Sequence, residues 1–391
     1  MTKVSKYKIL IIILGIIIIV LLIFYYSLSP VKRNIAKQKI LHTTHLLNPD
    51  WSKSIIKSND GGYVANFTSS TLLVDGIYPS MLGPTAYKTF LLDDREDEIY
   101  WITGLEVGAN TNQKTQNKSS DFICHVNLYH SEVEHYARMQ MEDRINNDQA
   151  PQLITLTKGD LDFSFPEGFG FPIFSNEKIL LGGQVLNLNH KNPLFTINYD
   201  FKIKFEKNKE KRLKPLYTRY AVLALPYDLT DEIDYDNQIT NDKVRCVILE
   251  GEHHGLNSKN KQGQPITAFW KVPPGKHIYR SNITSFLALD TIVTLHKINS
   301  HVHPFANSLA LRDITIDSTL FKSVVTNYKD KIGLDKITSF ASQKGIKLYP
   351  NHLYELVEEV DNTTDSEIEM MGSMFLYFYD YKLDRILDSI N

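Results

Sequence analysis

The sequence predicts an all-β protein in which two antiparallel β-sandwich domains follow an N-terminal transmembrane helix. Three observations lead to this fold class: one long apolar run near the N-terminus, many short runs rich in Ile, Val, Phe and Tyr between Gly and Pro turn signals, and few long helical patterns. The length of 391 residues suits two domains beyond an anchor, and 42% hydrophobic residues are enough to form a core in each.

The first element is the apolar run at residues 9–26, which carries no charge and is close to the roughly 20 residues that span a bilayer. Lys3, Lys6 and Lys8 precede it, and the positive-inside rule then keeps the N-terminus cytoplasmic. The alternative is a cleaved signal peptide, but the run exceeds the usual apolar length of about 7–15 residues, and Pro30 follows the small residues Ser27 and Ser29. We therefore expect a single-pass anchor, with the domains on the exported side (periplasmic, lumenal or extracellular).

The domain boundary is predicted within the charge-dense segment 202–214, which has little apolar surface to bury and ends before Pro215. This segment is interpreted as a hairpin tip or an interdomain connection. It divides the chain into a cytoplasmic tip and anchor (1–30), a first β-sandwich (31–214) and a second β-sandwich (215–391). Alternating apolar residues predict strands at 122–128 and 184–190, and two helical patterns are expected at 132–146 and 330–344.

Charge and cysteine content restrict the classes of partner and cross-link. The net charge is −2 and Lys and Arg are dispersed, so a nucleic-acid partner is excluded because the chain lacks a basic field; the predicted anchor makes the membrane a partner instead. The chain has two cysteines, Cys124 and Cys246. On the exported side they can form a disulfide, and a role for Cys124 as a metal ligand is the competing assignment.

Histidines provide the candidate metal ligands. His301 and His303 are spaced i, i+2, so on a strand both imidazoles point to one face and can reach one metal ion. His125 lies in the middle of an apolar strand, and His190 is expected to close another. Each of these also fits an ordinary hydrogen-bonded histidine, and His130, on the strand face opposite His125, is interpreted as a surface residue.

A methionine cluster precedes the aromatic run near the C-terminus. Thioethers are soft ligands that suit Cu(I), although methionines also simply fill hydrophobic cores. The cluster consists of Met370, Met371 and Met374.

Taken in order, four segments resemble the copper type II, ascorbate-dependent monooxygenases, the family of peptidylglycine α-hydroxylating monooxygenase and dopamine β-hydroxylase. The segment 121–128 (DFICHVNL) stands where the family carries a His-His pair. The segments 165–172 (FPEGFGFP) and 179–193 (ILLGGQVLNLNHKNP) match its turn and its strand ending in histidine. Residues 272–284 (VPPGKHIYRSNIT) precede His301-Val302-His303 as in the family, and residues 365–379 (DSEIEMMGSMFLYFY) resemble its methionine strand.

The resemblance implies two jelly-roll-like domains with one copper each. His301, His303 and Met371, with Met370 as an alternate, would hold the catalytic copper. His125 and His190 would hold the electron-transfer copper, with Cys124 as a possible thiolate in place of the family's first histidine.

The expected activity is that of an oxidoreductase, a copper-dependent monooxygenase that hydroxylates a C–H bond of a small-molecule or peptide substrate. O2 and a reductant such as ascorbate would be the co-substrates. Where the family has a carboxylate-binding arginine this chain has Asn299, and Phe375 replaces a pocket tyrosine, which disfavours a C-terminal glycine peptide as substrate. The alternatives are a non-catalytic exported binding module and a copper carrier on the same fold.

Overall fold

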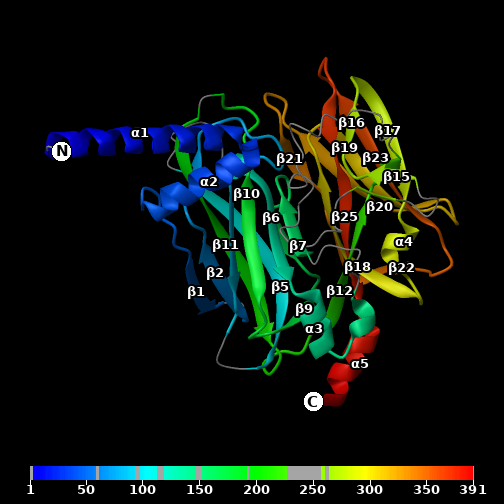
Figure 1. The fold of residues 1–391 in the computed structure, drawn as a ribbon. Helices are drawn as coiled ribbons and strands as arrows, with labels where there is room; N and C mark the ends of the chain where they lie inside the picture. The colour runs from blue at the N-terminus through cyan, green and yellow to red at the C-terminus, as the bar shows by residue number, and fades with distance from the viewer. Residues whose placement is uncertain are drawn as a thin grey trace.

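A computed structural model provides the fold; it describes residues 3–58, 61–93, 97–111, 119–145, 152–191, 193–226, 257–259 and 264–390. The predicted fold class is confirmed: an N-terminal apolar helix is followed by two jelly-roll-like antiparallel β-sandwiches (Figure 1).

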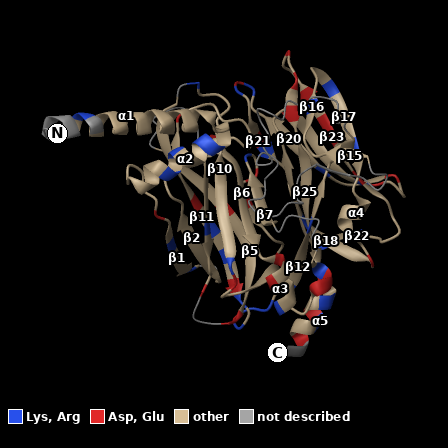
Figure 2. Cartoon of the chain, in the orientation of Figure 1, with Lys and Arg blue, Asp and Glu red and all other residues tan. Residues whose placement is uncertain are grey.

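The apolar helix α1 (Lys3–Ser27) extends away from the sandwiches (Figure 1). Its segment Leu10–Ser27 is long and apolar enough to cross a membrane and is not buried against the rest of the chain; a signal sequence has the same features. Most of the helix is free of charged residues (Figure 2).

Helix α2 (Pro30–Thr43) was not predicted, and it packs on the first sandwich. It begins where Ser29 Oγ accepts a hydrogen bond from the Lys32 amide at 3.4 Å, with Pro30 in the first turn, where a missing N–H costs nothing. Gln38, the buried residue of this helix, bonds both backbone groups of Leu73. The pair therefore ties α2 to the strand that contains Leu73.

The first sandwich packs two sheets around a core rich in aromatic residues. One sheet contains β1 (Ser52–Lys57), β2 (Tyr63–Thr68), β11 (Phe195–Lys207), β5 (Ile99–Thr111) and β9 (Phe169–Phe174), with β3 (Leu72–Val74) beside β11 and β8 (Asp162–Ser164) beside β5. The other sheet contains β4 (Thr85–Phe90), β10 (Ile179–Val185), β6 (Ile123–His130) and β7 (Gln152–Thr157).

The second sandwich has the same two-layer construction around its own core. One sheet contains β12 (Lys214–Val222), β25 (Gly372–Tyr379), β18 (Val293–Val302) and β22 (Phe340–Leu348); the other contains β17 (Gly275–Asn282), β23 (Tyr354–Asn362), β19 (Ala306–Asp313), β20 (Ser318–Asn327) and β21 (Leu334–Ile337). Small sheets join β13 (Leu225–Pro226), β15 (Pro265–Thr267) and β14 (Asn257–Lys259), and also β16 (Trp270–Val272) and β24 (Ile368–Met370).

The two sandwiches share one continuous sheet of 11 strands, because β12 pairs in parallel with β9 at its start and antiparallel with β25 along its length. Of the charge-dense segment 202–214, the first part belongs to β11, where Phe201, Ile203 and Phe205 alternate with exposed or half-buried charges. The short connection 208–213 then leads into β12.

Short helices occupy the ends of the sandwiches: α3 (Glu132–Arg138), η1 (Ser119–Phe122), η2 (Glu142–Arg144), α4 (Thr284–Leu287) and α5 (Tyr381–Ile390). The helix predicted at 132–146 is shorter than expected. Helix α3 begins at the N-cap Ser131, ends at Arg138 and is followed by η2.

The helix predicted at 330–344 is wrong, because this stretch forms β21 and the first part of β22. Its buried residues Leu334 and Ile337 are three apart, which fits a helix face. In the structure β21 pairs with β20, with Ile337 opposite Val325, so tertiary pairing outweighs the local pattern.

Candidate metal centre

His301 lies near the end of β18, next to β25 in the shared sheet, and His303 directly follows the strand. Their ring centroids are 5.6 Å apart with the rings nearly perpendicular. His301 pairs with Ser373 across the two strands and Val302 pairs with Gly372. Because side chains alternate along a strand, the two imidazoles point to the same face, as their spacing predicts.

His125 comes from the first sandwich and lies on the side that faces this pair, although the ligand atoms of the three histidines are not all within 4.8 Å of one another. It lies on β6 opposite Thr157 of β7, on the same strand face as Asn127, which accepts a 2.8 Å hydrogen bond from Thr155 Oγ1. Asn299, two residues before His301, donates to the backbone oxygen of Thr155 at 2.6 Å. The β6–β7 sheet and the face of β18 that carries the histidines therefore meet at the interdomain boundary.

The three imidazoles lie close enough to influence one another's protonation. Burial lowers the pKa of His125 to about 4, with a smaller contribution from His303. Burial lowers the pKa of His301 well below its usual value, and both His303 and His125 add to the effect. The pKa of His303 is also lowered by burial. All three rings are therefore neutral at pH 7, the state in which imidazole binds metals.

The cluster offers free nitrogen donors in a nearly dry setting. His125, His301 and His303 are only 3%, 8% and 6% exposed. Nδ1 of His301 and Nε2 of His303 have no hydrogen-bond partner among the described residues. Nδ1 of His303 lies 3.3 Å from the Glu369 carbonyl, a contact that fixes the ring and leaves Nε2 as the free nitrogen. Unpaired imidazole nitrogens in the interior fit a copper ion, which takes such ligands.

The two candidate methionine ligands have different surroundings. Met370 is fully buried in the core of the second sandwich, on β24 opposite Trp270. Met371 instead packs with Val222, Ala268 and partly buried neighbours that include Phe269, whose ring centroid is 6.2 Å from that of His303. Met371 and His303 thus share Phe269 as a neighbour, whereas Met370 belongs to the second core.

Cys124 is a buried free thiol. Its Sγ lies 3.4 Å from His125 Nδ1 and 3.6 Å from Ser80 Oγ. Burial raises the pKa of this thiol, so in the absence of a metal it stays protonated. Cys246, the cysteine with which Cys124 could form a disulfide, lies outside the described residues.

His190 does not lie on a strand, contrary to the prediction for 184–190, because β10 ends at Val185. It stands in a turn in which the Asn187 side chain accepts a hydrogen bond from the His190 amide at 3.1 Å and donates one to its carbonyl at 2.9 Å. Its ring lies 5.7 Å from that of Phe122, at the edge of the first core. The family resemblance pairs His125 with His190, whereas the structure groups His125 with His301 and His303.

His130 was interpreted as a surface residue, and this is wrong: it is 8% exposed at the end of β6, a strand whose residues are buried on both faces. Its neighbours are His135 and Glu177, two residues that sequence analysis did not single out. The only sequence signal for this group was the spacing of five residues between His130 and His135. That spacing places two side chains on one face of neither a strand nor a helix.

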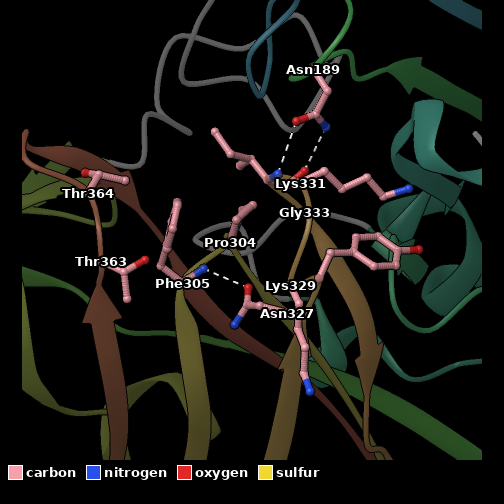
Figure 3. Close-up of a pocket in the computed structure, with 11 residues that line it drawn as sticks. Asn189, Pro304, Phe305, Asn327, Lys329, Lys331, Gly333, Thr363 and Thr364 are labelled. Carbon is pink, nitrogen blue, oxygen red and sulfur yellow. Dashed lines mark hydrogen bonds between the residues drawn. The ribbon is translucent and has the colours of Figure 1, made fainter.

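A cavity of about 330 Å³ opens where loops of the two sandwiches meet (Figure 3). Pro304 and Phe305, which directly follow His303, line one side, and Asn189, which precedes His190, lines another. The Asn189 side chain crosses the boundary between the sandwiches: its amide donates a hydrogen bond to the Ile332 carbonyl and accepts one from the Ile332 N–H (Figure 3). Chain neighbours of two candidate ligands thus form part of the cavity lining.

The sequence matches no protein-family model and no curated protein. Among solved structures, the chain is similar to a crystal structure of peptide-N(4)-(N-acetyl-beta-D-glucosaminyl) asparagine amidase, with 8% identity, a TM-score of 0.32, and coverage of 84% of this chain and 96% of the other.

A recombinant peptide:N-glycanase F gives 8% identity, a TM-score of 0.33, and coverage of 81% and 96%. A triple jelly roll from the turret of an archaeal virus gives 9% identity, a TM-score of 0.17, and coverage of 79% and 59%. TM-scores of this size carry no information on the reaction or substrate of this chain.

Proposed function

We propose that this chain is a membrane-anchored, copper-dependent oxidoreductase with its copper site between the two sandwiches, at His125, His301 and His303. The supporting observation is that three buried, neutral imidazoles from two domains face one another across the boundary, two of them with unpaired ring nitrogens; a shared copper would require their side chains to move closer together. Unpaired polar atoms in an interior destabilise a fold by about 1–3 kcal/mol each, so a ligand for them is expected.

Copper is favoured over other metals by the donors near the cluster. Imidazole suits copper, zinc, iron and nickel alike, but the thioether of Met371 on the His303 side adds a soft donor that favours Cu(I). Copper supplies one-electron redox chemistry, which in the family that the sequence resembles serves C–H hydroxylation with O2 and a reductant such as ascorbate. Monooxygenation is therefore the proposed activity.

The surrounding residues orient and protect the ligands. The Glu369 carbonyl holds His303 through Nδ1, and the Cys124 sulfur lies beside Nδ1 of His125. Burial keeps all three imidazoles unprotonated at neutral pH and excludes water from the site.

The grouping of His125 with the second-domain pair supports one shared copper site at the boundary. In the two-copper arrangement of the family, His125 would serve another metal together with His190. Metal stoichiometry distinguishes the two arrangements.

The substrate is proposed to be a small molecule or peptide that enters through the cavity lined by Pro304, Phe305 and Asn189. Asn299 stands where the family has an arginine for a carboxylate, and here its amide is engaged with Thr155 across the boundary. A substrate carboxylate therefore has no arginine at this position to bind it. We propose that α1 anchors the domains on the exported side of a membrane, as its preceding lysines indicate.

The test is copper loading of the full chain in detergent, followed by removal of weakly bound metal and measurement of copper content, Cu(II) EPR and O2 uptake with ascorbate. We expect one copper per chain with nitrogen hyperfine structure, lost in His301→Ala and in His125→Ala. His277→Ala is the matched control, because this half-exposed histidine of β17 lies away from the site and contacts the Pro274 carbonyl and the Tyr279 ring.

Each outcome decides between alternatives. Copper that persists in both His301→Ala and His125→Ala would contradict the site. Two coppers, of which His190→Ala removes one, would restore the two-site arrangement. Copper held without O2 uptake above that of His301→Ala, across a broad set of candidate substrates, would indicate a carrier, and no retained copper would indicate a binding module.

A further inference from the structure

A second group of metal-binding side chains lies where β6 ends. His130 is the last residue of β6, His135 lies in α3, and Glu177 is in the turn between β9 and β10. One ligand atom from each of the three lies within 4.8 Å of the other two, and all three residues are buried. Three separate elements thus bring two imidazoles and a carboxylate together.

This group is distinct from the candidate copper centre. His130 is five residues beyond His125 on the same strand, which at about 3.3 Å per residue places it roughly 17 Å away. Five is an odd number, so the two side chains also point to opposite faces of the sheet.

The carboxylate of Glu177 lies in the protein interior. Glu177 and His135 are 0% exposed. One oxygen, Oε2, lies 2.9 Å from His135 Nδ1 and accepts a weak 3.4 Å bond from the Phe174 amide. When ionised, a carboxylate at this depth is stabilised by positive charge close by.

The hydrogen bonds within the group leave three atoms without partners. Nδ1 of His130, Nε2 of His135 and Oε1 of Glu177 have none among the described residues. The contact between His130 Nδ1 and Glu177 Oε1, at 3.8 Å, is too long for a hydrogen bond. A cation held by one ligand atom from each of the three residues would neutralise the carboxylate and give this buried polar group a ligand.

We propose that His130, His135 and Glu177 form a site for a divalent transition-metal ion, with Zn²⁺ the best match. Two imidazoles and one carboxylate are a donor set found with Zn²⁺ and with non-haem Fe²⁺. The ring of Phe171 lies 5.2 Å and 5.1 Å from the two imidazoles, and Tyr136 packs beside His135 at 4.9 Å. This aromatic enclosure limits water access, which suits a structural ion.

The ion would fix α3 in place. Helix α3 contributes Tyr136 to a small core that also contains Met139 and, from the C-terminal helix α5, Leu383 and Leu387. A metal ion bound to α3, β6 and the β9–β10 turn would therefore also stabilise the packing of α3 against the C-terminal helix α5.

The test uses the full chain in detergent, stripped of metal with a chelator and titrated with Co²⁺ and then Zn²⁺. It is run on the wild type and on His301→Ala, which lacks the candidate copper ligand. We expect Co²⁺ to give visible d–d absorption at one equivalent in His301→Ala and at one or more equivalents in the wild type, and Zn²⁺ to displace it. Zn²⁺ should also raise the Tm and slow amide hydrogen exchange across residues 130–138.

Glu177→Gln keeps the size of the side chain and should lower Zn²⁺ affinity at least 100-fold. Glu167→Gln is the matched control, since this exposed glutamate near the start of β9 should leave affinity unchanged.

Absence of a one-equivalent Co²⁺ or Zn²⁺ complex in the wild type would overturn the proposal, and this measurement stands even if Glu177→Gln fails to fold. Metal binding lost in His301→Ala but kept in Glu177→Gln would also overturn it while leaving the proposed copper centre intact. Loss of copper in His301→Ala with Zn²⁺ binding unchanged would support both sites.

Discussion

Arg144 donates two hydrogen bonds to the carboxylate of Asp380, from Nε to Oδ2 at 3.0 Å and from Nη2 to Oδ1 at 3.1 Å. The two residues are 236 positions apart in the sequence. The guanidinium also lies over the Tyr217 ring, 4.5 Å from its centroid. Asp380 is completely buried, and its Oδ1 accepts the Leu383 amide at the start of α5. The pair thus connects the end of the first sandwich to the C-terminal helix.

Arg144→Ala is expected to lower the free energy of unfolding by about 3–5 kcal/mol, because it leaves a buried carboxylate without its counter-charge. Urea denaturation measures the change. Arg385→Ala, on the exposed side of α5, is the control and should cost less than about 0.5 kcal/mol. Equal losses in the two variants would show that the ion pair contributes nothing specific.

The free edge of β7 is closed by side chains from the second sandwich. Tyr377 Oη donates to the Leu153 carbonyl at 3.0 Å, and Asn299 donates to the Thr155 carbonyl two residues further on. Tyr377→Phe removes one of these bonds with little change of shape and should cost about 1–3 kcal/mol, because a buried carbonyl loses its partner. Thermal unfolding of the variant tests this, and an unchanged Tm would mean that water replaces the hydroxyl.

Glu358 predicts a pH-dependent stability. Both of its carboxylate oxygens are buried without a hydrogen-bond partner among the described residues, and burial raises its pKa to about 8. Between about pH 4.5 and 8 the unfolded chain loses this proton while the folded chain keeps it, so stability should fall as pH rises, by at most about 5 kcal/mol. Glu358→Gln, which cannot ionise, should flatten the profile and be more stable than wild type at pH 8. Parallel denaturation profiles at pH 5 and pH 8 would contradict this.

Gly83 marks a close approach of two backbone segments. A Cβ at this position would lie 1.9 Å from the carbonyl oxygen of Val185, and backbone cannot easily move aside. Gly83→Ala should therefore destabilise by more than about 2 kcal/mol, in the range of overpacked sites. Gly108→Ala on β5 is the control, because a Cβ there meets nothing within 4 Å. Similar midpoints of chemical denaturation for the two variants would disprove the steric explanation.

Met371→Leu tests the proposed role of the Met371 thioether as a copper ligand. If copper binds as proposed, Cu(I) affinity should fall at least tenfold while the fold is retained, because leucine is close in volume to methionine. Met370→Leu is the matched substitution in the second core and should leave Cu(I) affinity unchanged. Competition with a coloured Cu(I) chelator measures both, and the opposite pattern would assign the ligand to Met370.

Local patterns accounted for much of the fold. The apolar run at 9–26, the strand at 122–128 and the same-face placement of His301 and His303 follow from length and from the period of two, which neighbouring residues determine. The same reasoning failed where a side chain or partner strand decides the conformation. At 330–344 pairing with β20 makes strands of a helix-like pattern, and at 186–190 the Asn187 side chain turns the chain before His190.

The sequence by itself therefore determined the class of fold, the apolar N-terminal helix and the individual candidate ligands. Only the tertiary structure decided which ligands meet. His125 joins His301 and His303 because β7 docks on β18 and β25 through bonds to the Leu153 and Thr155 carbonyls. His130, His135 and Glu177 meet because the end of β6, the helix α3 and the β9–β10 turn lie together. Contacts between residues far apart in the chain depend on how whole sheets pack, and the local spacing of residues does not encode that packing.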